Sequence, residues 1–379
     1  MSEEKKLILK MFKEGKISEE EAIDLLSSVG ENKTKSKIND NFDDAGEKIE
    51  NSVNKFVNKI FNGIELAFNK VGDALDESDF KNNKFNFTFN NTNAQTILKN
   101  KIENIENKIN LFINNKNGKT EIEPWNENHI EIESEINFND KHLDSNSNFI
   151  TEKKKDNNYF IGVNQELNAS HFNVTFRIKT PYNAISNLKI ESTNGKIVAN
   201  YLELNDLETS TTNGKTIFEG LVANNVNSTT TNGKIEINDI NANELKLKTT
   251  NSKIDIDDIN ANYVETITTN GKLELIKINT KVLKGKNSNG SIHVLLAKDE
   301  IKNIDLKSSN GGIYLENLNY KRPIEAVLKA RDKNSLSNIF THIEKNGNLT
   351  IARTENYDSD AENKLNINLA TTNGRISLI

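Results

Sequence analysis

Short apolar pairs recur along this chain at a constant interval. Apolar residues stand three and five, eight and ten, and thirteen positions after Asn194, with Thr209 at the fifteenth position and mostly polar residues between them. The arrangement then returns at every nineteenth position, and its period is marked by Asn194, Asn213, Asn232, Asn251, Asn270 and Asn289. Apolar residues two apart are typical of short strands with one face inward. Each unit therefore predicts a coil with three short sides.

A unit of this length cannot bury its own apolar face, but stacked units bury theirs against one another. The pattern predicts a mainly β protein, a parallel β-solenoid in which equivalent residues form columns. We expect right-handed coils, because parallel crossovers favour that hand. The column eight positions after each Asn should be buried, and it contains Leu202, Leu221, Ile240, Ile259, Ile278 and Ala297.

The pentapeptide Thr-Thr-Asn-Gly-Lys occupies Thr211–Lys215 and returns twice more in register with the period. A phosphate-binding loop needs the fuller pattern Gly-x-x-x-x-Gly-Lys-Ser/Thr before a helix, and the chain does not contain it. We therefore interpret the pentapeptide as a corner of the coil. Asn tolerates the left-handed backbone region and Gly enters it without steric cost, so we expect a left-handed backbone there.

The pattern loosens on both sides of the regular coils. The interval from Asn117 to Asn194 is close to four repeat lengths, and the interval from Asn289 to Asn310 is two positions longer than one repeat. The two extra positions predict a bulge or longer corner at Lys298–Lys302. The stretch 320–347 breaks the period, and we interpret it as a long insertion or a closing coil that protects the end. The β-solenoid domain is expected to cover residues 81–379.

The N-terminal stretch 1–80 has a helical pattern instead. Residues 1–30 predict a hairpin of two short helices, the second starting at Ser18 with Glu21 in the capping-box position. Residues 31–80 predict a linker and an amphipathic helix of about 30 residues. Its apolar side chains include Phe56, Ile60, Phe61, Ile64 and Phe68. We favour packing on the solenoid end or on a second copy in a coiled coil, with membrane-surface binding as the alternative.

Composition limits the chemistry. The 379-residue chain has no cysteine and a net charge of -6, so thiolate chemistry is excluded and we expect no nucleic-acid partner. Five scattered histidines lack ligand spacing, no nucleophile elbow occurs, and we expect neither catalytic residues nor a cofactor. Four acidic residues on neighbouring coils raise a cation site as a hypothesis, against which we favour a solvated edge with interspersed lysines: Asp239, Asp255, Asp257 and Asp258.

The repeated "TNGKI" units resemble a bacterial family of unknown function called the putative-adhesin domain, whose members repeat Asn-Gly-x-Ile-x-Ile through a β-solenoid. The resemblance covers roughly residues 85–379. The stretch "MFKEGKISEEEAIDLL" resembles the helical hairpin that precedes this domain in LiaX-like and YvlB-like proteins of Firmicutes. Together they imply a role in the cell-envelope stress response, including sensing of membrane-active antimicrobial agents, and they supply no catalytic residue.

We therefore expect a non-enzymatic scaffold or sensor whose helical N-terminus binds a partner or the membrane surface. A self-assembling adhesive or cytoskeletal filament is the alternative, and a carbohydrate-active enzyme is the least favoured class. The chain shows no signal-peptide pattern and no run of about 18 apolar residues. We expect a cytoplasmic protein, with a peripheral location at the membrane or cell envelope as the alternative.

Overall fold

The computed structural model describes residues 83–87, 94–102, 107–138, 143, 147–168, 170–297, 300–318, 321–331 and 334–379. All of them belong to Leu75–Ile379, one of the two units into which the chain divides. Within this described part, 24 strands form one continuous sheet and no helix occurs. Both predicted helical segments, residues 1–30 and the amphipathic helix within 31–80, lie outside the described residues and stay predictions.

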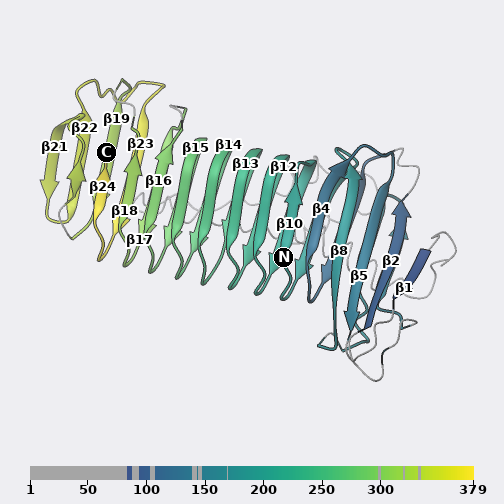
Figure 1. Cartoon of the computed structure of the whole chain (residues 1–379). Helices are drawn as coiled ribbons and strands as arrows, with labels where there is room; N and C mark the ends of the chain where they lie inside the picture. The colour runs from purple at the N-terminus through teal and green to yellow at the C-terminus, as the bar shows by residue number, and fades with distance from the viewer. Residues whose placement is uncertain are drawn as a thin grey trace, which may run out of the picture. The chain divides into compact units, whose positions relative to one another are not determined.

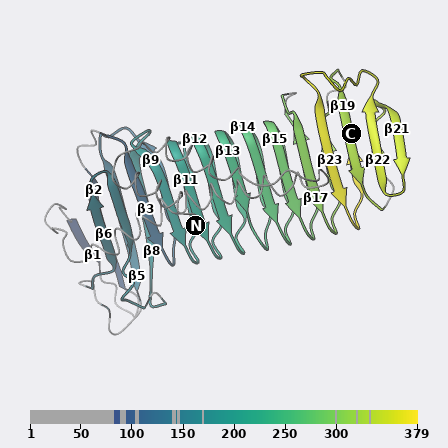
Figure 2. The same cartoon turned by 180° about the vertical axis from the view of Figure 1, so that it is seen from behind.

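The centre of this unit is a stack of coils with a constant register. Four long strands form it: β12 (Thr216–Thr230), β13 (Ile235–Lys248), β14 (Ile254–Thr268) and β15 (Leu273–Asn287). Each pairs in parallel with the next, so that Ile235 lies beside Ile254 and Leu245 beside Val264. The row of equivalent strands is visible from both sides (Figures 1 and 2). This is the solenoid-like, mainly β stack that the period predicts.

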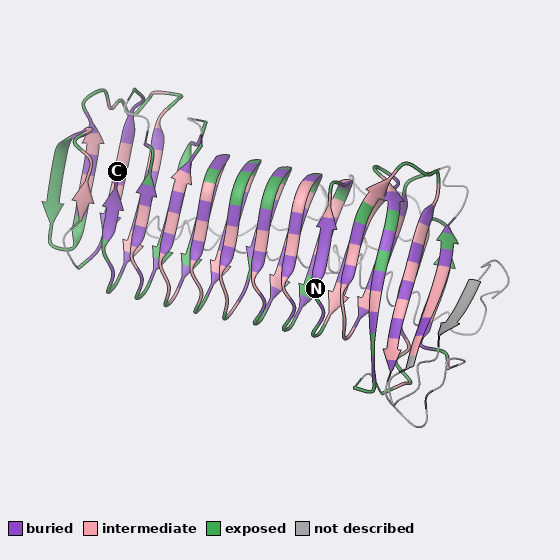
Figure 3. Cartoon of the chain, viewed as in Figure 1, coloured by how far each residue is buried: buried purple, intermediate pink, exposed green. Residues whose placement is uncertain are grey.

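The inward residues of each coil lie on three short sides. In the coil after Asn213 the buried pairs are Thr216 and Phe218, Leu221 and Ala223, and Val226 and Ser228. Buried bands therefore alternate with partly exposed ones along β12 to β15 (Figure 3). One predicted core residue is wrong, because Ala297 is exposed. The register shifts after Ile276, and Leu296 takes the buried place beside Ile278.

Two rows of strands run along the stack and continue beyond its first regular coil. One row contains β1 (Asn83–Phe87), β2 (Ala94–Ile102), β5 (Ile130–Phe138), β8 (Phe172–Pro181), β4 (Thr120–Trp125) and β10 (Ile197–Asn200). The other contains β6 (Ile150–Lys155), β7 (Asn158–Val163), β3 (Ile109–Asn115), β9 (Ile185–Ser192) and β11 (Glu203–Thr211). Pairing is antiparallel from β1 to β8 and between β6 and β7, and parallel elsewhere.

Asn117 and Asn194 lie in adjacent coils of the stack, although the interval between them is close to four repeat lengths. The side-chain amide of Asn194 donates to Asn117 Oδ1 at 2.7 Å, and β4 pairs directly with β10. The intervening strands β5 to β8 extend the two rows outward instead of forming further coils. The irregular first part that the sequence predicts is thus an insertion between adjacent coils.

The other end closes in a similar way. Its strands are β16 (Ile292–Leu296), β17 (Asn303–Ser308), β18 (Ile313–Glu316), β19 (Ile324–Lys329), β20 (Ser335–Leu336), β21 (Phe340–Asn346), β22 (Leu349–Thr354), β23 (Leu365–Thr371) and β24 (Ile376–Leu378). The extra positions lie in the corner between β16 and β17, as expected. β23 and β24 form the last coil, while β19, β22 and β21 continue one row past it. The stretch 320–347 therefore closes this end.

Candidate functional site

A column of exposed asparagine side chains follows one corner of the stack. Each Nδ2 donates to the Oδ1 of the preceding Asn at 2.7–2.8 Å, through eight consecutive bonds. The column contains the six periodic residues Asn194, Asn213, Asn232, Asn251, Asn270 and Asn289, with Asn117 before them and Asn310 and Asn373 after. Because each inner amide both donates and accepts, the column fixes the register between coils.

The residue three places before each turn Gly supplies a second column, which is largely buried. Thr211 Oγ1 accepts a hydrogen bond from Gly214 N at 3.0 Å, and Thr230 does the same for Gly233. Ser192, Asn287, Ser308 and Thr371 fill the same role in other coils. These side chains satisfy a turn N–H that would otherwise lack a partner. The sequence pattern assigns this corner to Asn and Gly alone and gives the Thr no role.

The expected left-handed corner at Asn-Gly is wrong for the turns from Gly195 to Gly374, whose glycines do not have positive φ, and it holds only at Gly118 after Asn117, where φ is 106°. The glycines of the other turns are needed for space instead. A Cβ on Gly214 would lie 1.7 Å from the carbonyl oxygen of Gly195 in the preceding coil. Where Ser252 replaces Gly, the Thr249 hydroxyl donates to Gly233 O at 3.2 Å.

A left-handed residue stands seven places after the Asn in every coil from Asn194 to Asn310 except the one that follows Asn289, where the register shifts. Its φ lies between 52° and 67° at Tyr201, Gly220, Asp239, Asp258, Lys277 and Asn317. This is the corner between the first and second sides, where the chain turns within the long strands. Only one of the six is glycine, so the column could not be recognised by residue type.

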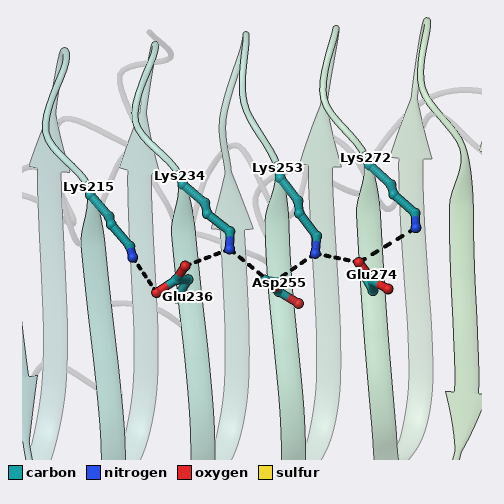
Figure 4. A network of polar contacts seen from close by, with 7 residues as sticks. All are labelled: Lys215, Lys234, Glu236, Lys253, Asp255, Lys272 and Glu274. Atoms are coloured by element: carbon teal, nitrogen blue, oxygen red, sulfur yellow. Dashed lines mark hydrogen bonds and ion pairs between the residues drawn. The ribbon is translucent and has the colours of Figure 1, made fainter.

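A ladder of alternating charges crosses four coils on the first side (Figure 4). Glu236 lies 2.5 Å from both Lys215 and Lys234, and Asp255 lies 3.0 Å from Lys234 and 2.9 Å from Lys253. Lys253 also pairs with Glu274, which Lys272 approaches to 3.6 Å. The lysines between the coils therefore bridge to neighbouring carboxylates instead of extending into solvent.

The contacts within the ladder lower the pKa values of its carboxylates Asp255 and Glu274. The hydrogen bond from Lys253 is the main cause of a lowered pKa at Glu274. At Asp255 burial acts to raise the pKa, but the bonds from Lys253 and Lys234 outweigh it and the net pKa is lowered. Opposite charge and hydrogen bonding both favour the ionised carboxylate. The carboxylates of Asp255 and Glu274 are consequently ionised near neutral pH.

The four acidic residues considered for a cation site do not converge. Asp255 belongs to the charge ladder and Asp257 lies 3.3 Å from Lys277. Asp239 and Asp258 occupy left-handed corners. No group of three His, Cys, Asp or Glu side chains suited to a metal occurs among the described residues. The contacts match the alternative interpretation, an edge with interspersed lysines such as Lys253.

Trp125 is held as a packing residue. Its Nε1 donates to the carbonyl oxygen of His129 at 2.8 Å, and the two rings meet edge to face at 4.6 Å. His293 stacks on Tyr314 in another part of the stack. The apolar residues proposed for partner or membrane contact, Phe56, Ile60, Phe61, Ile64 and Phe68, lie outside the described residues.

Comparison with known proteins identifies the class of this fold. The family model described as Toastrack DUF4097 matches residues 109–378. The chain therefore belongs to that family, a family of unknown function. No curated protein matches the sequence. No helix in the described part is long and apolar enough to cross a membrane.

Three solved structures are similar. A putative adhesin from Bacteroides fragilis is 11% identical, with a TM-score of 0.40, over 75% of this chain and 97% of that one. A putative cell adhesion protein from Clostridium sporogenes is 13% identical, with a TM-score of 0.20, over 75% and 98%. A putative adhesin from Parabacteroides merdae is 14% identical, with a TM-score of 0.31, over 58% and 92%.

Proposed function

We propose that this protein is a non-enzymatic scaffold or sensor of the bacterial cell-envelope stress response. In this proposal the coil stack is a rigid rod, and the amphipathic segment before it binds a protein partner or the membrane surface. The protein works in the cytoplasm or peripherally at the envelope. The resemblance of the N-terminal segment to LiaX-like and YvlB-like proteins motivates the stress role.

One observation carries the scaffold proposal: the repeated polar side chains of the stack bond to one another. The asparagine amides are used in coil-to-coil bonds, and the ladder carboxylates lie against lysines. A catalytic group needs a polar atom directed toward a substrate. Groups engaged in this way stiffen the stack and fix its length, which suits a rod that holds bound partners at a distance.

The alternative, a filament made by stacking of coil ends, has less support. In the part of the chain that the structure describes, each row ends at the N-terminal side in an antiparallel strand, β1 or β6, and the row that contains β19 ends in antiparallel β21. An open parallel coil would template another coil more readily. We also propose right-handed winding, on the preference of parallel crossovers for that hand.

Co-sedimentation of the full-length protein with phosphatidylglycerol vesicles tests the N-terminal contact. If the helix binds membrane, binding should be strong at low salt and should weaken as salt screens its lysines. If it binds a second copy, sedimentation velocity should show a concentration-dependent oligomer without lipid. A protein that remains monomeric and does not bind vesicles would contradict both self-association and membrane contact, leaving only a different partner.

A pair of matched variants distinguishes a contact made through the apolar seam of the predicted helix from a general effect of added charge. Phe56→Glu with Phe68→Glu places two charges on the apolar seam, whereas Asn58→Glu with Asn62→Glu places the same charges on the opposite face of the predicted helix. The first variant should lose vesicle binding or oligomerisation, and the second should keep most of it. Equal behaviour of the two variants would argue against a seam-mediated contact.

A further inference from the structure

A basic cavity lies at the C-terminal end of the column of Asn-Gly turns, beside the hairpin formed by β21 and β22. Its volume is 360 Å³, at the lower end of the range for ligand pockets. Four cationic side chains line it: Lys286, Lys307, Lys329 and Arg331. None of the lining residues that the structure describes is an aspartate or glutamate. It comes from the last three turns, the end of β19 and the turn between β21 and β22.

Strand register brings the lysines together. Along one outward column Lys286 pairs with Lys307, Lys307 with Ala370, and Ala370 with Lys329. Neighbouring strands lie about 4.8 Å apart, so the lysines lie within reach of one ligand. Ala370 places only a methyl group between two lysines, which leaves room beside the strand. β19 then leads into Ala330 and Arg331, which follow Lys329 as Thr371 and Thr372 follow Ala370.

The cations of this cavity are less neutralised than those of the charge ladder. Lys286, Lys329 and Arg331 form no ion pair within the described part of the chain. Lys307 contacts Asp305 at 3.0 Å, and that carboxylate lies outside the cavity lining. In the charge ladder, by contrast, each lysine contacts one or two carboxylates. Among the described residues of its wall, the cavity thus concentrates positive charge without a carboxylate.

Neutral donors complete the wall. Ser288, Ser309 and Thr372 line the cavity from the last three turns, each directly before the Asn of its turn. Their hydroxyls make no hydrogen bond within the described residues. The buried residues next to them, Asn287, Ser308 and Thr371, are bonded to glycine carbonyls of the preceding turn and hold these turns in place. Hydroxyl donors on a fixed turn column therefore face the same space as the cations.

We propose that this cavity binds a phosphate group. Guanidinium and ammonium groups form charge-assisted hydrogen bonds with phosphate oxygens, and the hydroxyls supply further donors. The phosphate belongs to a free phosphorylated small molecule or to the headgroup of an anionic lipid, and both have the same recognition chemistry. The described residues of the site all belong to the coil stack, so the site would add a ligand to the proposed scaffold.

Titration calorimetry of the full-length protein with pyrophosphate at low ionic strength tests the site. We expect saturable binding that weakens as salt is added. Lys329→Gln with Arg331→Gln removes two exposed cations and should weaken binding at least roughly tenfold, because hydrogen bonds to charged groups are the strong ones. Lys196→Gln with Lys248→Gln removes two exposed lysines elsewhere on the stack and should leave the affinity unchanged.

Ala370→Glu provides a second test, because it fills the gap and places a carboxylate between Lys307 and Lys329. Ala370→Glu should abolish pyrophosphate binding. Ala370→Gln introduces a side chain of the same size without the charge, so it should weaken pyrophosphate binding less. Thermal melts of all variants establish that they fold. Absence of pyrophosphate binding by the wild type, or equal affinity in the Lys329/Arg331 variant, would overturn the proposal.

Vesicle co-sedimentation shows whether the bound phosphate belongs to a lipid headgroup. It uses phosphatidylglycerol vesicles and the variant Phe56→Glu with Phe68→Glu, which disables the apolar seam of the predicted N-terminal helix. Vesicle binding that survives in this background and disappears with Lys329→Gln and Arg331→Gln identifies a headgroup. Pyrophosphate binding without vesicle binding identifies a free ligand. Failure of the N-terminal proposal would leave the pyrophosphate result unaffected, so the two proposals fail separately.

Discussion

At the scale of single residues, backbone strain collects in the left-handed column rather than at the Asn-Gly turn. Lys277 has a φ of 52°, whereas the equivalent positions include Gly220, Asp239 and Asn317. A left-handed conformation costs an ordinary side chain roughly 1–2 kcal/mol, and Asn tolerates it better. Lys277→Asn should therefore raise the free energy of unfolding by about 1 kcal/mol, since the exposed pair with Asp257 contributes little.

Urea unfolding followed by circular dichroism measures this difference. Lys281→Asn is the control, because it is an exposed lysine four positions away with an ordinary φ. It should leave the stability nearly unchanged or slightly lower. A stabilisation of equal size in both variants would show that charge, not backbone conformation, is responsible.

Two neighbouring residues of one turn should differ in their cost. A Cβ on Gly233 would lie 1.7 Å from Gly214 O, so the coils must move apart. Gly233→Ala should cost about 1–3 kcal/mol, as overpacking does. Asn232→Ala removes two exposed hydrogen bonds of the asparagine column, one donated to Asn213 and one accepted from Asn251. It should cost about 1 kcal/mol. Thermal melts that gave the larger loss for Asn232→Ala would contradict the close-contact explanation.

At the scale of strands, the charge ladder should make stability depend on pH. Asp255 and Glu274 have lowered pKa values in the folded protein, so their contribution is present above the unfolded pKa and is lost as pH falls through the folded one. The window therefore lies below about pH 4, near and below the ordinary carboxylate values. The stability of the wild type should fall there more steeply than that of Asp255→Asn.

Urea midpoints between about pH 7 and pH 3 provide the measurement. Each ladder pair is partly exposed, so we expect a difference of less than about 1 kcal/mol between the two proteins. Asp258→Asn is a matched control, because Asp258 lies outside the ladder and should leave the slope as in the wild type. An identical slope in all three proteins would show that the ladder carries no net stability.

The strands also show how far sequence reasoning reaches. The period was readable because each coil repeats the same inward positions, and those columns are buried from Ile197 to Ile292. The left-handed column was missed because Tyr201, Asp239 and Lys277 have no residue type in common. The long step from Asn117 was not predictable, since length alone does not show whether a segment forms coils or pairs with itself. The basic cavity depends on register across the last coil, which the broken period conceals.

At the scale of the whole stack, the closing strands determine whether copies can join end to end. β21 is an edge strand that pairs only with β22 within the described sheet, and residues 341–346 are exposed along it. Its Glu344 and Lys345 present charges at the edge, and at the opposite end β6 carries Lys153, Lys154 and Lys155. Charged side chains on an edge strand oppose pairing with another chain.

Removing that protection should turn the closed end into a site of association. Glu344→Val with Lys345→Val leaves Thr341–Asn346 without acidic or lysine side chains and extends the apolar run that begins at Ile343, itself 45% exposed. The variant should form oligomers or fibrils whose amount rises with protein concentration. The wild type under the same conditions should not associate through β21. Glu344→Thr with Lys345→Thr removes the same charges without adding apolar surface, and it separates electrostatic protection from hydrophobic pairing. If neither variant associates in sedimentation velocity, the closing strands protect the end by their geometry alone, and the charges on β21 have no part in keeping the stack from lengthening.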